Sequence, residues 1–233
     1  MRVGARPVLA AATMGIAVVV AACGGTGPAP STSVPPATTA PSTTSTSPST
    51  AQPSTAIWPF ASTTVRYTSP IAAARGFART YLGFSNPVVG PFQQGDSRSG
   101  EVEVRASPSG VVTTVLVRML APGDTWWVLG SVASTLALHS PAALSPISSP
   151  VTLTGESTAF EGTINLELRQ DGTLTPLATA TTQGGSKGQM GPFTATVSFP
   201  SPVAGAGAIV VRTISAEDGA TEAASTVRIA YAR

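Results

Sequence analysis

Apolar and polar residues alternate through the last part of the chain, from about residue 143 to its end. Alternation with a period of two is typical of strands that bury one face and leave the other in water. Turn signals such as Asp171-Gly172 separate the runs, at roughly the eight- to twelve-residue spacing of β-sandwiches. The pattern predicts an all-β, immunoglobulin-like antiparallel sandwich over residues 143–233. The alternating runs are 151–153, 163–169, 193–199, 209–211 and 227–231.

Residues 57–140 combine one helical pattern with several strand patterns. Ser69 and Pro70 suit the N-cap and the first position of a helix, and Gly83 suits its end. Turn residues separate the strand patterns that follow. One helix followed by an antiparallel sheet predicts an α+β domain. The helical positions are Ile71, Ala74, Phe77, Ala78, Tyr81 and Leu82, and the strand patterns cover 101–106, 111–120 and 125–132.

Trp126 and Trp127 are the candidate interaction surface of this α+β domain. Neighbouring residues of a strand point to opposite faces. We therefore expect one tryptophan in the core and the other at a surface or interface. Glu101 and Glu103 share one strand face, and we interpret them as solvated charges rather than a catalytic carboxylate pair.

The N-terminus has the pattern of a secretory signal. Arg2 and Arg6 precede an uncharged run of 16 residues, 7–22, which is shorter than the roughly 20 residues of a membrane-spanning helix. The run ends in Val20-Ala21-Ala22-Cys23-Gly24, which resembles the lipobox of bacterial lipoproteins. The resemblance implies a diacylglyceryl group on Cys23 and removal of residues 1–22. It places the protein at the extracytoplasmic face of the cell membrane, with the membrane as a partner through the lipid.

Residues 23–56 contain no charged side chain and are rich in Ser, Thr and Pro. Such a segment buries too little apolar surface to offset the entropy of ordering. It predicts a disordered tether between the lipid and the folded residues.

Composition excludes several function classes. Removing Arg2 and Arg6 from the 13 basic side chains leaves 11, which equals the number of acidic side chains. A neutral folded part lacks the basic surface of a nucleic-acid-binding protein, so no nucleic-acid partner is expected. One Cys and one His exclude a disulfide framework and a Cys/His zinc site. We expect no metal and no cofactor.

Two motifs look like serine nucleophiles. Ser186 lies in a literal G-x-S-x-G, and Ser97 follows Gly95-Asp96 as in GDS-type esterases. The only histidine, His139, precedes Ser186, and Leu136 stands where an esterase would place its Asp. We assign no catalytic residue. We interpret His139 as a surface or hinge residue, and Asp171-Gly172 and Glu217-Asp218-Gly219 as turns rather than calcium ligands.

The second domain resembles a known family. Its motifs are Ile147-Ser148-Ser149-Pro150-Val151, Gly155, Ala159-Phe160-Glu161-Gly162-Thr163, Gly191-Pro192-Phe193 and Ser215-Ala216-Glu217-Asp218-Gly219. These runs resemble the immunoglobulin-like domain of bacterial spore-germination proteins (Gmad2), over residues 145–231. The resemblance implies a non-catalytic module of envelope proteins and does not imply germination. Phe160 is expected to fill the sandwich core, and Gly162 to allow a sharp corner.

These patterns predict a lipid-anchored envelope protein that binds or scaffolds an envelope protein or a wall glycan, without catalysis. One alternative is a carrier in which the helix and curved sheet enclose a lipid or other apolar molecule. A second alternative is an envelope hydrolase. The sequence leaves open whether the two domains pack together or swing about residues 140–146.

Overall fold

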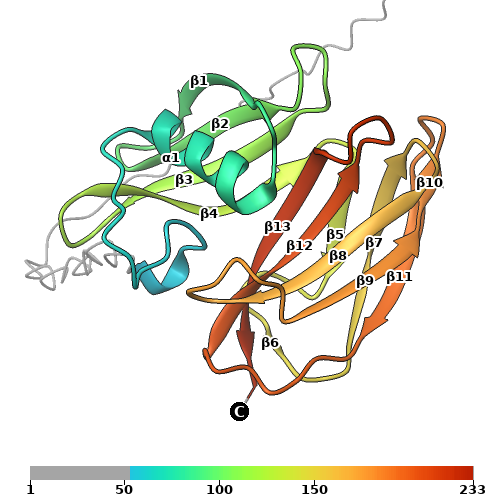
Figure 1. Cartoon of the computed structure of the whole chain (residues 1–233). Helices are drawn as coiled ribbons and strands as arrows, with labels where there is room; N and C mark the ends of the chain where they lie inside the picture. Colours follow the sequence, from blue (N-terminus) through green and yellow to red (C-terminus); the bar gives the residue numbers. More distant parts are fainter. Residues whose placement is uncertain (1–52, 233) are drawn as a thin grey trace, which may run out of the picture. The chain divides into compact units, whose positions relative to one another are not determined.

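The computed structural model describes residues 53–232, in which one short helical segment precedes an almost entirely antiparallel set of strands (Figure 1). The predictions for the signal segment, Cys23 and the tether lie outside the described residues. The elements are η1 (Pro53–Thr55), α1 (Pro70–Gly76), η2 (Phe77–Leu82), β1 (Val88–Gln94), β2 (Ser99–Arg105), β3 (Thr113–Leu120), β4 (Thr125–Ala133), β5 (Leu136–Ser140), β6 (Pro146–Ile147), β7 (Val151–Ala159), β8 (Thr163–Gln170), β9 (Ala178–Gln183), β10 (Gly185–Ser186), β11 (Gly191–Val197), β12 (Ala206–Ile214) and β13 (Thr221–Tyr231).

The predicted helix is confirmed as α1 and the π-helical turns of η2. The Ser69 hydroxyl accepts a hydrogen bond from the Ala72 N–H at 3.5 Å, and Pro70 occupies the first turn. Gly83 ends the helix in the left-handed conformation, with φ of 81°, which glycine adopts without the clash a side chain would bring. No helix among the described residues is long and apolar enough to cross a membrane.

Four strands form the sheet beside this helix. β2, β3 and β4 are the three predicted strands, and β1 pairs with β2 at the edge of the sheet. Sequence patterns did not predict β1, because Gly90 and Pro91 interrupt its apolar residues. The α+β prediction for the first half is confirmed.

The second half is a two-layered β-sandwich, as predicted. One layer contains β13, β12, β8 and β9, and the other contains β5, β7 and β11. β5 belongs to the sandwich by pairing, since Leu136, Ala137 and Leu138 lie opposite Ser157, Glu156 and Gly155 of β7. The predicted fold class, an α+β part followed by an all-β sandwich, is confirmed for the described residues.

The two halves share a wall, the β12–β13 pair. One face of this pair contributes Ala208, Val210 and Ala224 to the core beneath the helix. The other face contributes Ile209 and Val211, with their neighbours, to the core of the sandwich. The described residues therefore form one body with two cores, rather than two domains that swing about a linker.

A polar seam joins β4 to β13. Thr226 pairs with Ser131, whose hydroxyl is 3.1 Å from the Thr226 hydroxyl. The Ala133 N–H donates to the Ser225 hydroxyl at 2.9 Å. These hydroxyl groups are buried, so their mutual hydrogen bonds remove the cost of leaving them unpaired.

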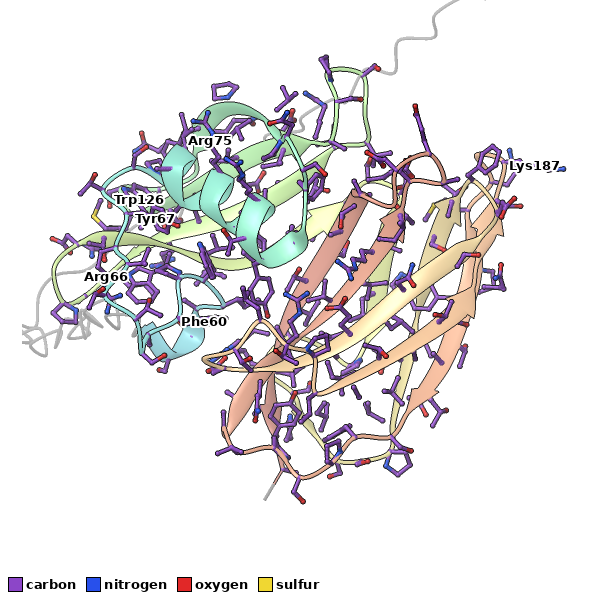
Figure 2. The ribbon with its side chains drawn as sticks, viewed as in Figure 1. Phe60, Arg66, Tyr67, Arg75, Trp126 and Lys187 are labelled. Carbon is purple, nitrogen blue, oxygen red and sulfur yellow. The ribbon has the colours of Figure 1, made fainter. Side chains whose placement is uncertain are left out.

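The segment before the helix crosses the free edge of β4. We call residues 56–67 the strap. Trp58 and Tyr67 form isolated bridges with Val128 and Trp126, and the Trp126 N–H donates to the Tyr67 carbonyl at 2.8 Å. Figure 2 labels Phe60, Arg66 and Tyr67 of the strap, with Tyr67 next to Trp126. The strap thus covers the part of β4 that β13 does not reach.

Candidate functional site

One end of the sandwich gathers exposed apolar side chains. We define the loop tip as residues 160–162, between β7 and β8, and 187–190, between β10 and β11. Ser186 pairs with Ala159 and Gly191 pairs with Ser157, so the two loops lie next to each other. Figure 2 labels Lys187 at this end of the sandwich.

Phe160 is the most exposed aromatic residue of the loop tip, with 77% of its surface accessible to solvent. The prediction that Phe160 fills the sandwich core is wrong. Alternation along β7 ends at Ala159, and the turn that follows releases Phe160 from the inward-facing positions. The core is instead filled from the strands, by residues such as Leu153, Ile164 and Phe193.

Gly162 makes this turn possible. Its φ is 74°, and a Cβ at this position would lie 3.0 Å from the Gly184 carbonyl oxygen. The Gly184 N–H donates a hydrogen bond to the Gly162 carbonyl at 2.8 Å. The sharp corner expected at Gly162 is confirmed, and it holds this loop against the junction of β9 and β10.

Met190 adds a second apolar side chain to the loop tip, 47% exposed. Lys187 and Glu161 are exposed beside it and carry opposite charges. An aromatic residue, a flexible thioether and a polar rim are the composition of small protein-binding surfaces.

Trp126 and Trp127 point to opposite faces of β4, as predicted, but neither is a surface residue. Trp126 is 8% exposed in the core beneath the helix, where Phe92 meets it edge-on. Trp127 is 1% exposed on the other face and packs against Leu120. The Arg66 guanidinium lies 4.8 Å from the centre of the Trp127 ring. We expected one tryptophan in the core and the other at a surface or interface. Both are buried, because the strap, which sequence patterns did not reveal, covers the face of Trp127.

The nucleophile candidates do not assemble into a catalytic group in the described part of the chain. Ser97 lies in the exposed β1–β2 turn, and Ser186 lies in β10. His139 is exposed on β5, and β5 and β10 flank opposite edges of β7. No hydrogen bond connects either serine to His139 among the described residues.

The acidic turns have structural contacts. The Asp218 carboxylate accepts the Ala220 N–H at 3.1 Å, and this bond lowers the pKa of Asp218. Asp171 pairs with Arg228, whose guanidinium also donates to the Ser54 carbonyl at 2.6 Å. Among residues 53–232, no group of three or more His, Cys, Asp or Glu side chains could hold a metal ion.

A buried ion cluster lies between the helix and the sandwich, and sequence reasoning missed it. Glu167 of β8 accepts hydrogen bonds from Arg169 and Arg212. Arg169 also donates to the Tyr81 carbonyl at 2.6 Å, and its guanidinium lies 4.6 Å from the Tyr81 ring centre. Thr221 of β13 donates to the Leu82 carbonyl at 2.7 Å. These contacts satisfy carbonyls at the end of the helix, which have no partner within it.

The signal for this cluster was present as Glu167, Arg169 and Arg212, charged residues on one face of adjacent strands. Alternation assigned that face to solvent. The structure shows that the helix packs on this face and buries it. The same burial raises the pKa of Tyr81 well above its usual range.

Comparison with known families agrees with the sandwich. Residues 136–220 match the family described as the immunoglobulin-like domain of bacterial spore germination. The match begins at the first residue of β5 and ends at the turn before β13. No curated protein and no solved structure matches the chain. An immunoglobulin-like domain of this kind is not typically catalytic and indicates a binding module.

Proposed function

We propose that this chain is a cell-envelope lipoprotein, held in the membrane by a lipid on Cys23, whose described residues form a non-catalytic module that binds another envelope protein. The observation that carries the proposal is the loop tip with its exposed Phe160. A phenylalanine with most of its surface in water contributes little to the stability of this fold. The same side chain would contribute strongly to a complex, because buried aromatic residues dominate the energetics of protein interfaces.

The construction of the tip supports this role. The hydrogen bond from the Gly184 N–H holds the Gly162 carbonyl next to the start of β10, and both loops of the tip stand on the paired strands β7, β10 and β11. A surface that is already ordered loses less conformational entropy on binding than a mobile loop does. Lys187 and Glu161 provide a mixed-charge rim, which suits a protein surface better than a strongly anionic polymer.

The carrier and hydrolase alternatives receive less support. The space between the helix and the sheet, where a lipid would be enclosed, is filled by Phe77, Tyr81, Phe84 and Trp126. A hydrolase would bring a nucleophile next to a base. Ser97, Ser186 and His139 are apart in the described residues.

A photo-reactive amino acid at position 160 tests the binding role in intact cells. Val203 provides the matched control, because it is 95% exposed and lies in the loop between β11 and β12. The end of β11 pairs with the start of β7, so this loop is at the opposite end of the sandwich from Phe160. We expect one recurrent protein adduct from position 160 and none of that mass from position 203. Equal labelling from both positions, or no adduct from position 160, would contradict the proposal.

The lipid anchor is tested separately with Cys23→Ala. We expect wild type to incorporate a clickable fatty acid and to fractionate with membranes after cleavage. The variant should incorporate none and keep its N-terminal segment. A variant that is cleaved and retained like wild type would contradict the anchor but leave the binding role intact.

A further inference from the structure

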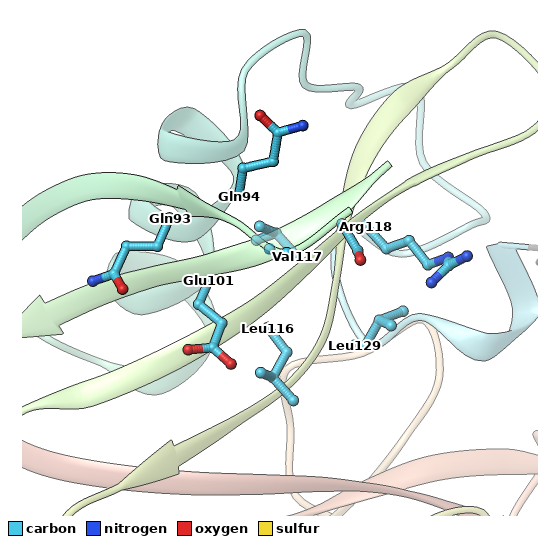
Figure 3. A pocket seen from close by; sticks show the side chains of 10 residues that line it. Gln93, Gln94, Glu101, Leu116, Val117, Arg118 and Leu129 are labelled. Atoms are coloured by element: carbon cyan, nitrogen blue, oxygen red, sulfur yellow. The ribbon is translucent and has the colours of Figure 1, made fainter. Parts of the chain in front are cut away.

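The outer face of the first sheet, opposite the helix, carries a cavity that the loop tip does not explain. It has a volume of about 440 Å³, within the range of small-ligand pockets, ~300–1,000 Å³. Strands β1 to β4 all contribute to its lining, and Figure 3 shows it with the helix behind the sheet. The inner face of the same strands carries the core valines Val102, Val104 and Val115. The cavity therefore lies on the outer face, which the alternation of apolar and polar residues predicts to be exposed to solvent.

Strand register builds the cavity from two rows. In the first row, Gln93 lies opposite Glu101, and Glu101 lies opposite Leu116. In the second row, Ser99 lies opposite Arg118, and Arg118 lies opposite Trp127. Adjacent residues in such rows are about 5 Å apart. An amide, a carboxylate, a guanidinium and an aliphatic surface therefore share one small area.

The polar groups of the cavity have almost no partners among the described residues. Within residues 53–232, the Glu101 carboxylate makes no ion pair and no hydrogen bond, and the side-chain amides of Gln93 and Gln94 make none. In the same part of the chain, the Arg118 guanidinium has one ionic contact, at 3.9 Å from the Asp96 carboxylate. A ligand could bind these groups without first breaking hydrogen bonds within the protein, although it would still displace water.

The floor of the cavity is apolar and supported from below. Leu116 and Leu129 line it, and Leu129 packs against the buried pair Trp127 and Leu120. The strap places the Arg66 guanidinium over Trp127. Packing on several sides holds the floor in place, which favours binding by reducing the entropy lost.

We propose that this cavity binds a segment of an uncharged oligosaccharide. Sugar hydroxyls both donate and accept hydrogen bonds, and amide, carboxylate and guanidinium groups together offer both functions. The C–H face of a sugar ring is apolar and would lie on Leu116 and Leu129. Glu101 and Arg118 cancel in charge, which disfavours an anionic polymer. A fatty acyl chain would leave the polar groups unpaired.

A bound peptide strand is a poorer occupant of this region. Peptides that add to a sheet pair with a free edge, and the edge here is β1. Pro91 removes one N–H donor from β1, and the register shifts between Val89 and Phe92. Both features are known to discourage pairing at sheet edges.

The site is separate from the loop tip. The oligosaccharide proposal therefore goes beyond the proposed function, and its failure would leave the binding role of the loop tip untouched. The test uses the full-length protein in detergent and two probes, the tetramer of N-acetylglucosamine and the glucose tetramer maltotetraose, followed by NMR. We expect saturable shifts confined to residues 93–101, 116–118 and 129 with at least one probe. Binding of the acetylated tetramer alone would indicate a wall-type glycan as the source. Binding of both would indicate general recognition of hydroxyl groups.

Glu101→Gln should weaken the binding by about tenfold, because hydrogen bonds to a carboxylate are replaced by weaker ones to a neutral amide and one acceptor oxygen becomes a donor. Glu156→Gln is the matched control, since Glu156 is also an exposed strand glutamate but lies on β7 in the sandwich. It should leave the affinity unchanged, and both variants should melt like wild type. The absence of shifts with both probes, shifts away from these strands, or a Glu101→Gln variant that binds like wild type would overturn the proposal.

Discussion

The two cores of this protein are built from different side chains. The core beneath the helix is aromatic, with Phe77 stacked on Tyr81 at 5.2 Å between ring centres and Trp58, Phe84 and Trp126 around them. The sandwich core is mainly aliphatic, with Phe193 and Tyr231 as its buried aromatic residues. The aliphatic core comes from strands with regular alternation. The aromatic core brings together the strap, the helix and the sheet, which follow one another in the sequence, with the shared wall, which lies more than 70 residues further on.

This difference teaches how the halves depend on each other. Removing the β12–β13 wall would leave the helix without Ala208, Val210 and Ala224 beneath it. The sandwich would lose the opposite face of the same strands. We therefore expect the two cores, although they differ in composition, to unfold together.

Truncating one large side chain in each core should give the largest effect, and it tests whether the two cores unfold together. Phe77→Ala should lower the free energy of unfolding by about 3–5 kcal/mol, and Leu168→Ala in the sandwich by about 2–5 kcal/mol. All three tryptophans lie in the first half, so their fluorescence reports on that half during urea unfolding. We expect Leu168→Ala to shift this fluorescence transition, although Leu168 lies in the other core.

Far-UV circular dichroism gives the second probe for the same variants. In one cooperative unit, fluorescence and dichroism give the same midpoint for wild type and for both variants. A Leu168→Ala variant that moves the dichroism transition and leaves the fluorescence transition in place would show that the cores unfold independently.

The sandwich could be predicted from the sequence because alternation and turns are local properties. Val151, Leu153 and Phe193 face inward where their runs place them. The helix was equally accessible through Ser69, Pro70 and Gly83. Neither pattern says which elements dock on each other, so the shared wall could not be predicted.

The candidate surfaces were less predictable than the fold, for a related reason. Trp127 is buried by the strap, and Phe160 leaves the core through the turn at Gly162. The cavity beside Glu101 depends on the register of β1 to β4, which includes an irregularity at Leu116 and Val117. Side-chain neighbours across strands come from pairing, and the sequence specifies pairing only through the whole fold.

The ion cluster where the helix meets the sandwich allows a sharper test of their coupling. Glu167→Ala would leave Arg169 buried without its carboxylate partner. We expect a loss of about 3 kcal/mol, near the low end for broken buried pairs, because Arg212 is 24% exposed and can be partly solvated. Thermal or urea unfolding measures the change. The exposed Glu156→Ala is the control and should change stability by less than about 0.5 kcal/mol. Equal stability of Glu167→Ala and wild type would show that the cluster does not hold the halves together.

Each core contains one buried tyrosine, and alkaline pH distinguishes their surroundings. Burial is the main cause that raises the pKa of Tyr81, and it also raises the pKa of Tyr231 to about 12. Above pH about 10 the unfolded chain loses these protons and the folded chain keeps them, so the free energy of unfolding falls as pH rises.

The free energy of unfolding of wild type falls between pH 9 and pH 11, and Tyr81→Phe should make this fall smaller by about 1 kcal/mol. Its hydroxyl makes no hydrogen bond among the described residues, so stability at neutral pH should change little. Tyr231→Phe should reduce the alkaline loss as well. It should also cost about 1 kcal/mol at neutral pH, because the Tyr231 hydroxyl donates to the Arg169 carbonyl at 3.1 Å. Urea unfolding at pH 7, 9 and 11 measures both effects. If Tyr81→Phe kept the full alkaline loss, the Tyr81 hydroxyl would have to be solvated, and the aromatic core would be looser than the aliphatic one.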